Sequence, residues 1–503
     1  MNLLRPNKYL LSFAAGLLAV PAVAPFNIFP LSVVALALLF ALWAREENPR
    51  TAAWMGFTFG FGLYGAGISF IYIALHDYGD MNFLLAAFVT ALAGAFLALF
   101  AALAGYAQAR LRTPLMMRLV LVMPALWVLL EWLRGLAFTG FPCMLAGYSQ
   151  VESPLGGYAP IFGVYGVSLM VAVSAGLLAW LMQILFPLLS WERVRVRGGL
   201  VIVALIVFWS GGALLRTVEW TQPQGEPLKV SLLQGNIPQE LKFNEDNLVD
   251  TLETYRRLIQ HTDARLIVLP ETAFPILRHE VPENLTAILR DHARKNAGDV
   301  LIGAFERDHG LYYNSVFTMG TAESQSYRKN HLVPFGEFIP LRPMLGWIIN
   351  DVLHIPMGDL ARGGERQQVL RVAGQNVAVD ICYEDVFGEE IIRYLPEATL
   401  LVNVSNDAWY GRSPAALQHN QVAQVRALES GRMMLRATNT GVTSIIDRDG
   451  KVLHILPQHE EGTLTAMVQG YTGSTPYVRF GNALVLGLIG VMLAACFWKR
   501  KRS

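Results

Sequence analysis

The sequence predicts a chain of two parts, a polytopic α-helical membrane domain and a layered α/β domain. Three observations lead to this expectation. The chain is 53% hydrophobic and only 16% charged, whereas an average soluble protein is about 25% charged. Residues 9–216 and 481–498 carry few of these charges, while residues 217–473 have the composition of a soluble domain. That central segment also alternates strand-like and helix-like stretches, which is typical of layered α/β folds.

The apolar regions contain eight stretches that approach the length of a membrane helix, which needs about 20 apolar residues. They cover residues 9–27, 30–44, 52–74, 83–107, 119–138, 161–186, 198–216 and 481–498. The fifth carries Glu131 and Arg134, which we expect to form an ion pair or, alternatively, to contact a lipid head group. The expected domains are residues 1–216 with about seven spans, residues 217–473, and residues 474–503 with a last span and a basic tail.

The loops orient these spans, because Lys and Arg accumulate on the cytoplasmic side of a membrane. Basic residues lie before the first span, after the second, fourth and sixth spans, and at 499–502, whereas the loop at 76–82 carries two aspartates and neither Lys nor Arg. Both termini are therefore expected in the cytoplasm, with residues 217–473 on the periplasmic side of an inner membrane. The first span and the small residues at 22–24 also resemble a cleavable signal peptide, and its removal would leave the large domain on the same side.

The central domain is expected to alternate strands and helices along the chain. Strands are predicted at 228–234, 265–269, 299–303, 313–319, 368–372, 376–382, 399–405, 442–447 and 452–455. Helices are predicted at 247–260, 283–296 and 414–434. On the last helix, Arg426, Glu429 and Arg432 are spaced for a structural stripe of paired charges.

Cys382 carries the most functional information, because it ends an apolar strand-like run and is one of only three cysteines. Two other polar signals precede it: Glu271 follows the strand-like run 265–269, and Lys329 ends the stretch 327–329, ahead of the string at 332–337. A cysteine is an effective nucleophile as a thiolate beside a base or a cation. Glu271 would accept the thiol proton, and Lys329 would stabilise an oxyanion together with the backbone N–H of Tyr383. These roles predict acyl transfer or amide hydrolysis through a thioester.

Each of the three residues also has a plain structural interpretation. A buried cysteine is often a small core residue, a lysine is normally a solvated charge, and a glutamate after Leu-Pro suits a helix N-terminus. Their combination in this order favours catalysis. The apolar residues around Glu271, at 270–275, predict that burial raises its carboxyl pKa. The sequence has neither a Gly-rich phosphate loop nor a metal-spaced His/Cys cluster, so no cofactor and no metal is expected, and the net charge of +1 gives no case for nucleic acid.

Several strings resemble the nitrilase (carbon–nitrogen hydrolase) superfamily and, more narrowly, its membrane branch, the apolipoprotein N-acyltransferase family. The strings are 269–272 (LPET), 331–338 (HLVPFGEF), 381–384 (ICYE), 405–411 (SNDAWYG), and, in the membrane half, 131–134 (EWLR), 140–142 (GFP) and 147–150 (GYSQ). The resemblance implies an α-β-β-α sandwich with a Glu271-Lys329-Cys382 triad. It implies a transferase that takes an acyl chain from a phospholipid, typically phosphatidylethanolamine, as a thioester. The acceptor would be the α-amino group of the diacylglyceryl-cysteine of an apolipoprotein.

The resemblance further implies supporting and substrate-contacting residues. Glu337, Tyr383 and Glu384 would support the active site. Phe243, Trp347 and Trp409 are candidate substrate contacts, although members of the family often have Trp where this chain has Phe243, and Cys143 stands where they often have an aromatic residue. Residues 344–357 are apolar and contain Trp347. They are expected to form either a core helix or, in the preferred interpretation, a lid at the membrane interface.

Two other functions would fit parts of this pattern. A membrane-anchored amidase or nitrilase would use the same three residues and transfer the acyl group to water. A transporter or receptor with an inactive extracellular domain would not need them. Cys143 and Cys382 share a side of the membrane in the expected topology, so a disulfide between them also stays open, but a nucleophile must be a free thiolate.

Overall fold

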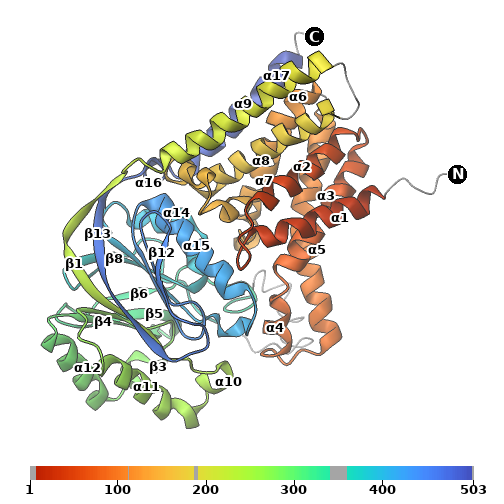
Figure 1. Ribbon diagram of the computed structural model, residues 1–503. Helices are drawn as coiled ribbons and strands as arrows, with labels where there is room; N and C mark the ends of the chain where they lie inside the picture. Colours follow the sequence, from red (N-terminus) through yellow and green to blue (C-terminus); the bar gives the residue numbers. More distant parts are fainter. Residues whose placement is uncertain (1–6, 112, 186–190, 340–358, 501–503) are drawn as a thin grey trace. The chain divides into compact units, whose positions relative to one another are not determined.

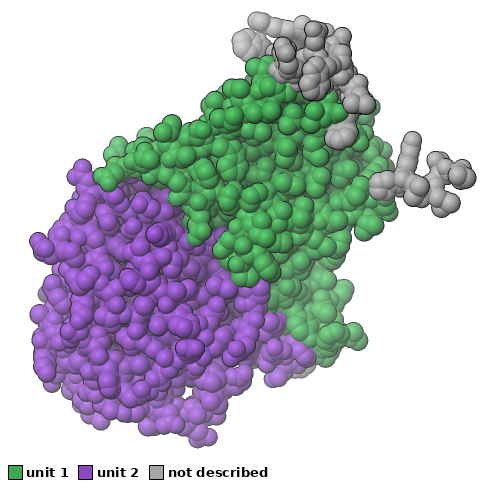
Figure 2. All heavy atoms as spheres, viewed as in Figure 1, with its two compact units in different colours: residues 1–72, 82–219, 479–503 green, residues 73–81, 220–478 purple. Residues whose placement is uncertain are grey.

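A computed structural model describes residues 7–111, 113–185, 191–339 and 359–500. The chain forms two compact units, coloured separately in Figure 2. The first comprises Met1–Tyr72, Asn82–Glu219 and Arg479–Ser503, and the second comprises Ile73–Met81 and Trp220–Val478. The expected lid at 344–357, including Trp347, lies entirely outside the described residues.

In the described part of the first unit, the regular secondary structure consists of helices, which turns and loops connect. Its helices are α1 (Lys8–Ala19), α2 (Pro30–Ala44), α3 (Pro49–Gly67), α5 (Phe83–Arg110), α6 (Leu115–Met117), α7 (Met123–Arg134), α8 (Ala159–Leu185), α9 (Trp191–Leu215) and α17 (Ala483–Arg500), while α4 (Ile71–His76) crosses the boundary with the second unit. Local sequence sets several starts: Asn48 caps α3 and Asn82 caps α5 by accepting backbone N–H groups of the first turn.

Four helical segments among the described residues are long and apolar enough to cross a membrane. They are Phe83–Arg110, Leu115–Arg134, Pro154–Leu185 and Gly198–Leu215, and three shorter apolar helices cover Lys8–Ala22, Pro30–Ala44 and Ala483–Cys496. The span expected at 52–74 is divided between α3 and α4 by a turn at residues 68–70. The apolar helices are those of a membrane protein.

Glu131 and Arg134 lie one turn apart on α7 and do not form the expected ion pair. Glu131 Oε1 accepts hydrogen bonds from Trp127 Nε1 and from the backbone N–H of Ala146, both at 3.1 Å. Arg134 Nη1 donates to the carbonyl oxygens of Phe141 at 2.6 Å and Cys143 at 2.8 Å. The two side chains instead bind backbone groups of the segment that follows α7, which lie within hydrogen-bond distance of both side chains.

The second unit contains two sheets. The first sheet has the strand order β13–β1–β2–β4–β5–β6, with β3 beside β4, and the second has the order β12–β11–β10–β9–β8–β7. The bounds in the first sheet are β1 (Thr221–Gln234), β2 (Leu266–Val268), β3 (Phe274–Leu277), β4 (Asp299–Asp308), β5 (Leu311–Gly320), β6 (Ser326–Arg328) and β13 (Gly462–Gly473). Those in the second are β7 (Leu370–Val372), β8 (Gln375–Ile381), β9 (Leu400–Ser405), β10 (Met434–Thr438), β11 (Ser444–Ile446) and β12 (Val452–Ile455).

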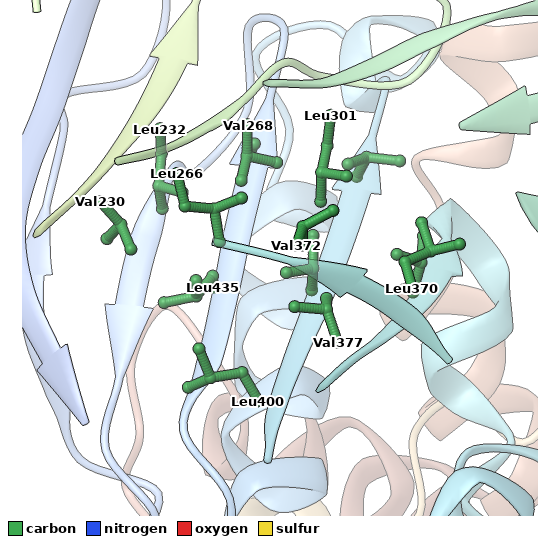
Figure 3. Packing of buried hydrophobic residues seen from close by; sticks show 14 of the residues in the cluster. Val230, Leu232, Leu266, Val268, Leu301, Leu370, Val372, Val377, Leu400 and Leu435 are labelled. Carbon is green, nitrogen blue, oxygen red and sulfur yellow. The ribbon is translucent and has the colours of Figure 1, made fainter. Parts of the chain in front are cut away.

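The two sheets pack face to face through a core of aliphatic side chains. Figure 3 shows Val230, Leu232, Leu266, Val268 and Leu301 of the first sheet against Leu370, Val372, Val377, Leu400 and Leu435 of the second. Helices cover both outer faces: α11 (Leu248–Gln260) and α12 (Glu283–Lys295) pack on the first sheet, and α14 (Gly388–Ile391) and α15 (Ala415–Ser430) on the second. The expected α-β-β-α sandwich is therefore confirmed.

The structure corrects three predictions near the end of this unit. The helix expected to reach residue 434 ends at Ser430, because Gly431 adopts a left-handed conformation with φ of 66°. Strand β10 follows at once and was not predicted. Strand β13 was also not predicted, because 10 of its 12 residues are exposed or partly exposed and its apolar signal is weak. It pairs antiparallel with β1 along 11 residue positions.

Candidate active site

Cys382 stands where β8 gives way to a 3₁₀ turn, Cys382–Val386. Its φ is 55°, a left-handed conformation that few non-glycine residues adopt. The thiol is free and the residue is half-buried. Asn403 Nδ2 donates to the carbonyl oxygen of Cys382 at 3.2 Å. A short turn after a buried strand thus places the sulfur at the end of β8, and the Asn403 side chain holds the carbonyl group of Cys382.

Glu271 follows β2 and is 6% exposed. Its Oε1 accepts from Asn314 Nδ2 of β5 at 2.7 Å, and its Oε2 accepts from the backbone N–H of Asn406, directly after β9, at 2.9 Å. Both sheets therefore position this carboxylate. Lys329 Nζ, also buried, lies 3.3 Å from Glu271 Oε1.

Lys329 follows β6 and connects two carboxylates. Its Nζ lies 2.9 Å from Glu337 Oε1, and Glu337 Oε2 accepts from the backbone N–H of Val333 at 2.8 Å. Burial would lower the pKa of Lys329, but Glu271 and Glu337 outweigh burial and raise that pKa well above its usual value. The lysine is consequently a permanent cation within the site.

The pKa of Glu271 differs from the sequence-based expectation. Burial would raise this pKa, but Lys329, Lys242 and the hydrogen bond from Asn314 outweigh burial and lower it. The expected rise is wrong because the apolar neighbours at 270–275 do not report the two ammonium groups that other segments bring. Glu271 is thus an anion at neutral pH, as a proton acceptor must be.

The pKa of the Cys382 thiol shifts in the opposite direction to that of Glu271. Burial and the charge of Glu271 raise the pKa of the thiol, and Lys329 offsets part of that rise. The sulfur therefore keeps its proton at rest. The charges of Glu271 and Lys329 both act on this sulfur, so the structure brings the three predicted residues into one site. The arrangement can transfer the proton to Glu271 as the sulfur attacks.

Glu384 braces the loops around Lys329 and Cys382. Its carboxylate accepts from the backbone N–H groups of Asn330 at 2.7 Å, His331 at 3.0 Å and Ile381 at 2.7 Å, and from the hydroxyl of Tyr327 at 3.0 Å. Burial raises the pKa of Glu384 to about 7, against these backbone hydrogen bonds. The neighbouring Tyr383 packs edge-on against His331 and Phe387.

The candidate substrate contacts lie on exposed parts of the second unit. Phe243 is 51% exposed and its ring lies 6.5 Å from that of Phe305. Trp409 is 42% exposed and packs edge-on against Tyr78 at 6.0 Å. Both are therefore available to an apolar ligand, whereas Trp347 lies outside the described residues.

Lys242 was missed by sequence reasoning. It ends the short helix α10 (Gln239–Lys242), is 2% exposed, and donates from Nζ to the carbonyl oxygen of Glu271 at 2.9 Å. Burial lowers the pKa of Lys242 to about 8, although Glu271 and Cys382 oppose that shift. The only available signal was its place beside Phe243, in a segment that follows a strand. Asn314 and Asn406 were missed too, since single amides give no pattern.

The other predicted features have plainer outcomes. Arg426 and Glu429 pair at 3.1 Å, whereas Arg432 lies beyond α15 and donates to the carbonyl oxygens of Ala398 and Gly473. Cys382 carries its thiol without a disulfide within the second unit. In the part of the chain that the structure describes, no group of three or more His, Cys, Asp or Glu side chains could hold a metal ion.

The second unit is an α-β-β-α sandwich with Glu271, Lys329 and Cys382 after its strands, and it is a domain of the carbon–nitrogen hydrolase class. The family model described as "Carbon-nitrogen hydrolase" matches residues 229–477, and the model described as "Apolipoprotein N-acyltransferase N-terminal domain" matches residues 15–177. The chain belongs to the apolipoprotein N-acyltransferase family.

Curated relatives match over nearly the whole chain. The apolipoprotein N-acyltransferase of Nitrosomonas europaea is 52% identical over 97% of this chain and 96% of its own length. Those of Methylococcus capsulatus and Chromobacterium violaceum are each 43% identical, over 98% and 97% of this chain and 96% and 93% of their own lengths. The similarity extends through the membrane helices as well as the sandwich.

Proposed function

We propose that this protein transfers an acyl chain from a phospholipid of the phosphatidylethanolamine type to the α-amino group of the diacylglyceryl-cysteine of an apolipoprotein. The single observation that carries the proposal is the buried set of Glu271, Lys329 and Cys382 in a chain whose full-length relatives are apolipoprotein N-acyltransferases. Both substrates are diacyl lipids, so the membrane helices of the first unit give the reaction access to them.

The first half-reaction forms a thioester. The sulfur of Cys382 attacks the ester carbonyl carbon of the phospholipid while its proton passes to Glu271. Lys329 and the backbone N–H of Tyr383 stabilise the oxyanion, which is where the charge develops. When the intermediate collapses, the carbon–oxygen bond to the lysophospholipid breaks, and the leaving oxygen takes the proton back from Glu271.

The second half-reaction forms the amide. The neutral α-amine of the acceptor attacks the thioester carbon, and Glu271 accepts a proton from the attacking nitrogen. The carbon–sulfur bond then breaks, and the sulfur recovers its proton from Glu271. The two half-reactions share one site and one proton carrier, which gives a ping-pong sequence.

We place the proposed reaction on the periplasmic side of the inner membrane, with both termini of the chain in the cytoplasm. Alternating basic loops support this orientation. Hydrolysis by water would need the same three residues. The full-length relatives favour transfer to an amine over the amidase alternative, because they share the membrane helices as well as the sandwich domain.

Intact-mass spectrometry of the purified full-length protein tests the proposal. Incubation with phosphatidylethanolamine should add one acyl mass that hydroxylamine removes, and Cys382→Ser should gain none. Adding a diacylglyceryl-cysteinyl peptide should discharge the acyl group onto the peptide. Discharge to free fatty acid in the presence of the peptide would establish a hydrolase instead. A folded protein that gains no acyl mass and releases no fatty acid would contradict both functions.

A further inference from the structure

Four charged side chains, three of them buried and the fourth (His419) partly buried, form a closed ring beside the Cys382 turn. His419 of α15 binds two carboxylates, Asp407 Oδ1 through Nδ1 and Asp385 Oδ1 through Nε2, both at 2.8 Å. Arg436 of β10 binds the second oxygens of the same carboxylates, at 3.1 Å to Asp385 Oδ2 and 3.0 Å to Asp407 Oδ2. Both aspartates and the arginine are almost fully buried. We call these four residues the ring, and the proposed acyl transfer uses none of them.

The ring holds the backbone of the nucleophile. Asp385 belongs to the 3₁₀ turn that Cys382 begins, and His419 Nε2 lies 3.2 Å from the carbonyl oxygen of Cys382. Asn403, which also donates to that oxygen, accepts a hydrogen bond from Arg436 at 2.5 Å. Because Cys382 has a left-handed φ of 55°, its conformation needs support from its surroundings. The ring supplies that support from a helix and a neighbouring strand.

The ring also acts on the sulfur through charge. Ser405 Oγ lies 3.0 Å from Asp407 Oδ1 and is also hydrogen-bonded to the sulfur of Cys382, so its single proton can be donated to one of the two at a time. The negative charge of Asp407 raises the pKa of that thiol, while the hydrogen bond from Ser405 lowers it. Two cations and two carboxylates sum to zero only while His419 carries a proton. A neutral His419 would leave one uncompensated negative charge near the sulfur.

His419 is held in the charged form by the same geometry. Burial and Arg436 would lower its pKa, but Asp385 and Asp407 outweigh them and raise the pKa of His419 to about 9. The other charged groups that act on the Cys382 thiol, lie in its site or adjoin the ring are Glu271, Glu337, Lys329, Lys242, Asp380 and Glu384. Lys242, with a pKa of about 8, and Glu384, with a pKa of about 7, also titrate near neutral pH, so the bend that identifies His419 is sought at higher pH, and Lys242→Met separates the contribution of Lys242.

We propose that the ring is a positioning device that fixes the Cys382 turn and, through the charge on His419, cancels the Asp407 charge that acts on the sulfur. This inference rests on the proposed role of Cys382 as nucleophile. It assigns to His419, Asp385, Asp407 and Arg436 a role in the reactivity of the thiol, with no contact to either substrate.

The test measures how fast iodoacetamide alkylates Cys382 in the full-length protein, with the alkylated cysteine identified by peptide mass spectrometry. Each unit of thiol pKa changes the reaction rate near neutral pH about tenfold, since the thiolate is the reacting form. His419→Asn should therefore slow alkylation about tenfold. The double variant His419→Asn/Asp407→Asn removes one cation and one anion, and it should recover most of the loss.

The pH profile distinguishes charge from packing. In the wild-type protein the rate should rise less steeply above a pH of about 9, where His419 loses its proton, and His419→Asn should lack that bend. Lys242→Met removes the other group that titrates in this range and should keep the bend. If His419→Asn does not fold, Lys242→Met alone still tests the proposal. An alkylation profile of Lys242→Met without the bend would overturn it.

Arg426→Gln is the matched control, because it breaks a buried ion pair on the same helix and leaves the ring intact. It should lower the melting temperature without changing the alkylation profile. Wild-type reactivity in His419→Asn, or a double variant slower than His419→Asn, would overturn the proposal. Alkylation needs no phospholipid, so the result stands apart from whether acyl transfer occurs.

Discussion

The two sheets of the sandwich contribute different kinds of charged cluster to one site. On the side of the first sheet, Lys329 lies 2.9 Å from Glu337 and 3.3 Å from Glu271, and Lys242 binds a backbone carbonyl rather than a carboxylate. On the side of the second sheet, each cation of the ring is bound by two carboxylates at 2.8–3.1 Å. In the first cluster Glu271 has the longer of the two contacts to Lys329, so this carboxylate can accept and release a proton as a reaction proceeds. The fully paired groups cannot do so without breaking several contacts, which suits them to positioning.

The largest expected effect on activity comes from the first cluster. Glu271→Gln keeps the shape of the side chain but removes the proton acceptor, so formation of the acyl-enzyme should slow by about 10³-fold, within the range for general-base removal. The melting temperature should fall, because a glutamine amide offers an acceptor to only one of Asn314 and Asn406 and removes a buried anion from Lys329, so the rate is measured on protein that is shown to be folded. Rapid-quench intact mass measures the rate.

Glu253→Gln, at an exposed carboxylate, is the control for this substitution and should acylate at the wild-type rate. Acylation of Glu271→Gln within tenfold of the wild-type rate would remove Glu271 from the proposed mechanism.

The largest expected effect on stability comes from the second cluster. Arg436→Gln leaves Asp385 and Asp407 buried with His419 as their remaining cation, and breaking a buried ion pair in this way typically costs about 3–5 kcal/mol. Chemical denaturation of the second unit, followed by tryptophan fluorescence, measures the loss. Arg256→Gln, which breaks an exposed pair with Glu253, should leave the denaturation midpoint in place. Equal midpoints for the two variants would show that the ring does not stabilise the sandwich.

Lys242→Met should separate activity from stability. The lysine is buried at a cost, since its pKa is lowered from 10.5 to about 8, which corresponds to about 3 kcal/mol at neutral pH. Methionine fills similar space without a charge, so the melting temperature should stay the same or rise. Loss of the ammonium beside Glu271 and Cys382 should slow acylation about tenfold or more. A variant that is both less stable and fully active would contradict this assignment.

The pH dependence of stability gives an independent check on Lys242. Between pH 8 and 10.5 the unfolded chain holds the Lys242 proton and the folded chain has lost it. The unfolded state therefore binds more protons, and the contribution of Lys242 to stability rises with pH over that range. The difference in unfolding free energy between wild type and Lys242→Met isolates this contribution. A difference that stays flat from pH 8 to 10.5 would mean that the pKa of Lys242 is normal.

Sequence reasoning found polar residues beside apolar stretches and missed those that meet them from elsewhere. Cys382 and Glu271 stand out because a polar side chain directly after a buried strand is a local signal, and Lys329 stands out because it precedes the string at 332–337. The ring has no local signal: Asp385, Asp407, His419 and Arg436 come from four separate elements, and only strand pairing brings them together. His419 in particular lies on a helix whose sequence is compatible with a solvent-exposed face.

The same limit explains the wrong expectation for Glu271. Its neighbours in sequence are apolar and predict a raised carboxyl pKa, whereas its neighbours in space include Lys329 and Lys242. Lys329 directly follows β6 and Lys242 ends α10, so both lysines lie on segments that follow strands of the first sheet. Strand β13 was missed for a related reason, since an edge strand with exposed positions has little apolar periodicity. Its existence follows from pairing with β1, a contact across more than 200 residues of chain.

The smallest expected effect concerns Ser405, which connects the ring to the sulfur. Ser405→Ala removes the hydrogen bond to Asp407 at 3.0 Å and the one that lowers the pKa of the thiol. One lost hydrogen bond should cost about 1 kcal/mol of unfolding free energy, and alkylation of Cys382 should slow only a few-fold. Ser444→Ala, which removes a buried hydrogen bond to Asn420 in the same sheet, should cost similar stability and leave alkylation unchanged. If both variants alkylate alike, the ring acts on the thiol through charge and backbone position, and the Ser405 hydroxyl plays no part in that coupling.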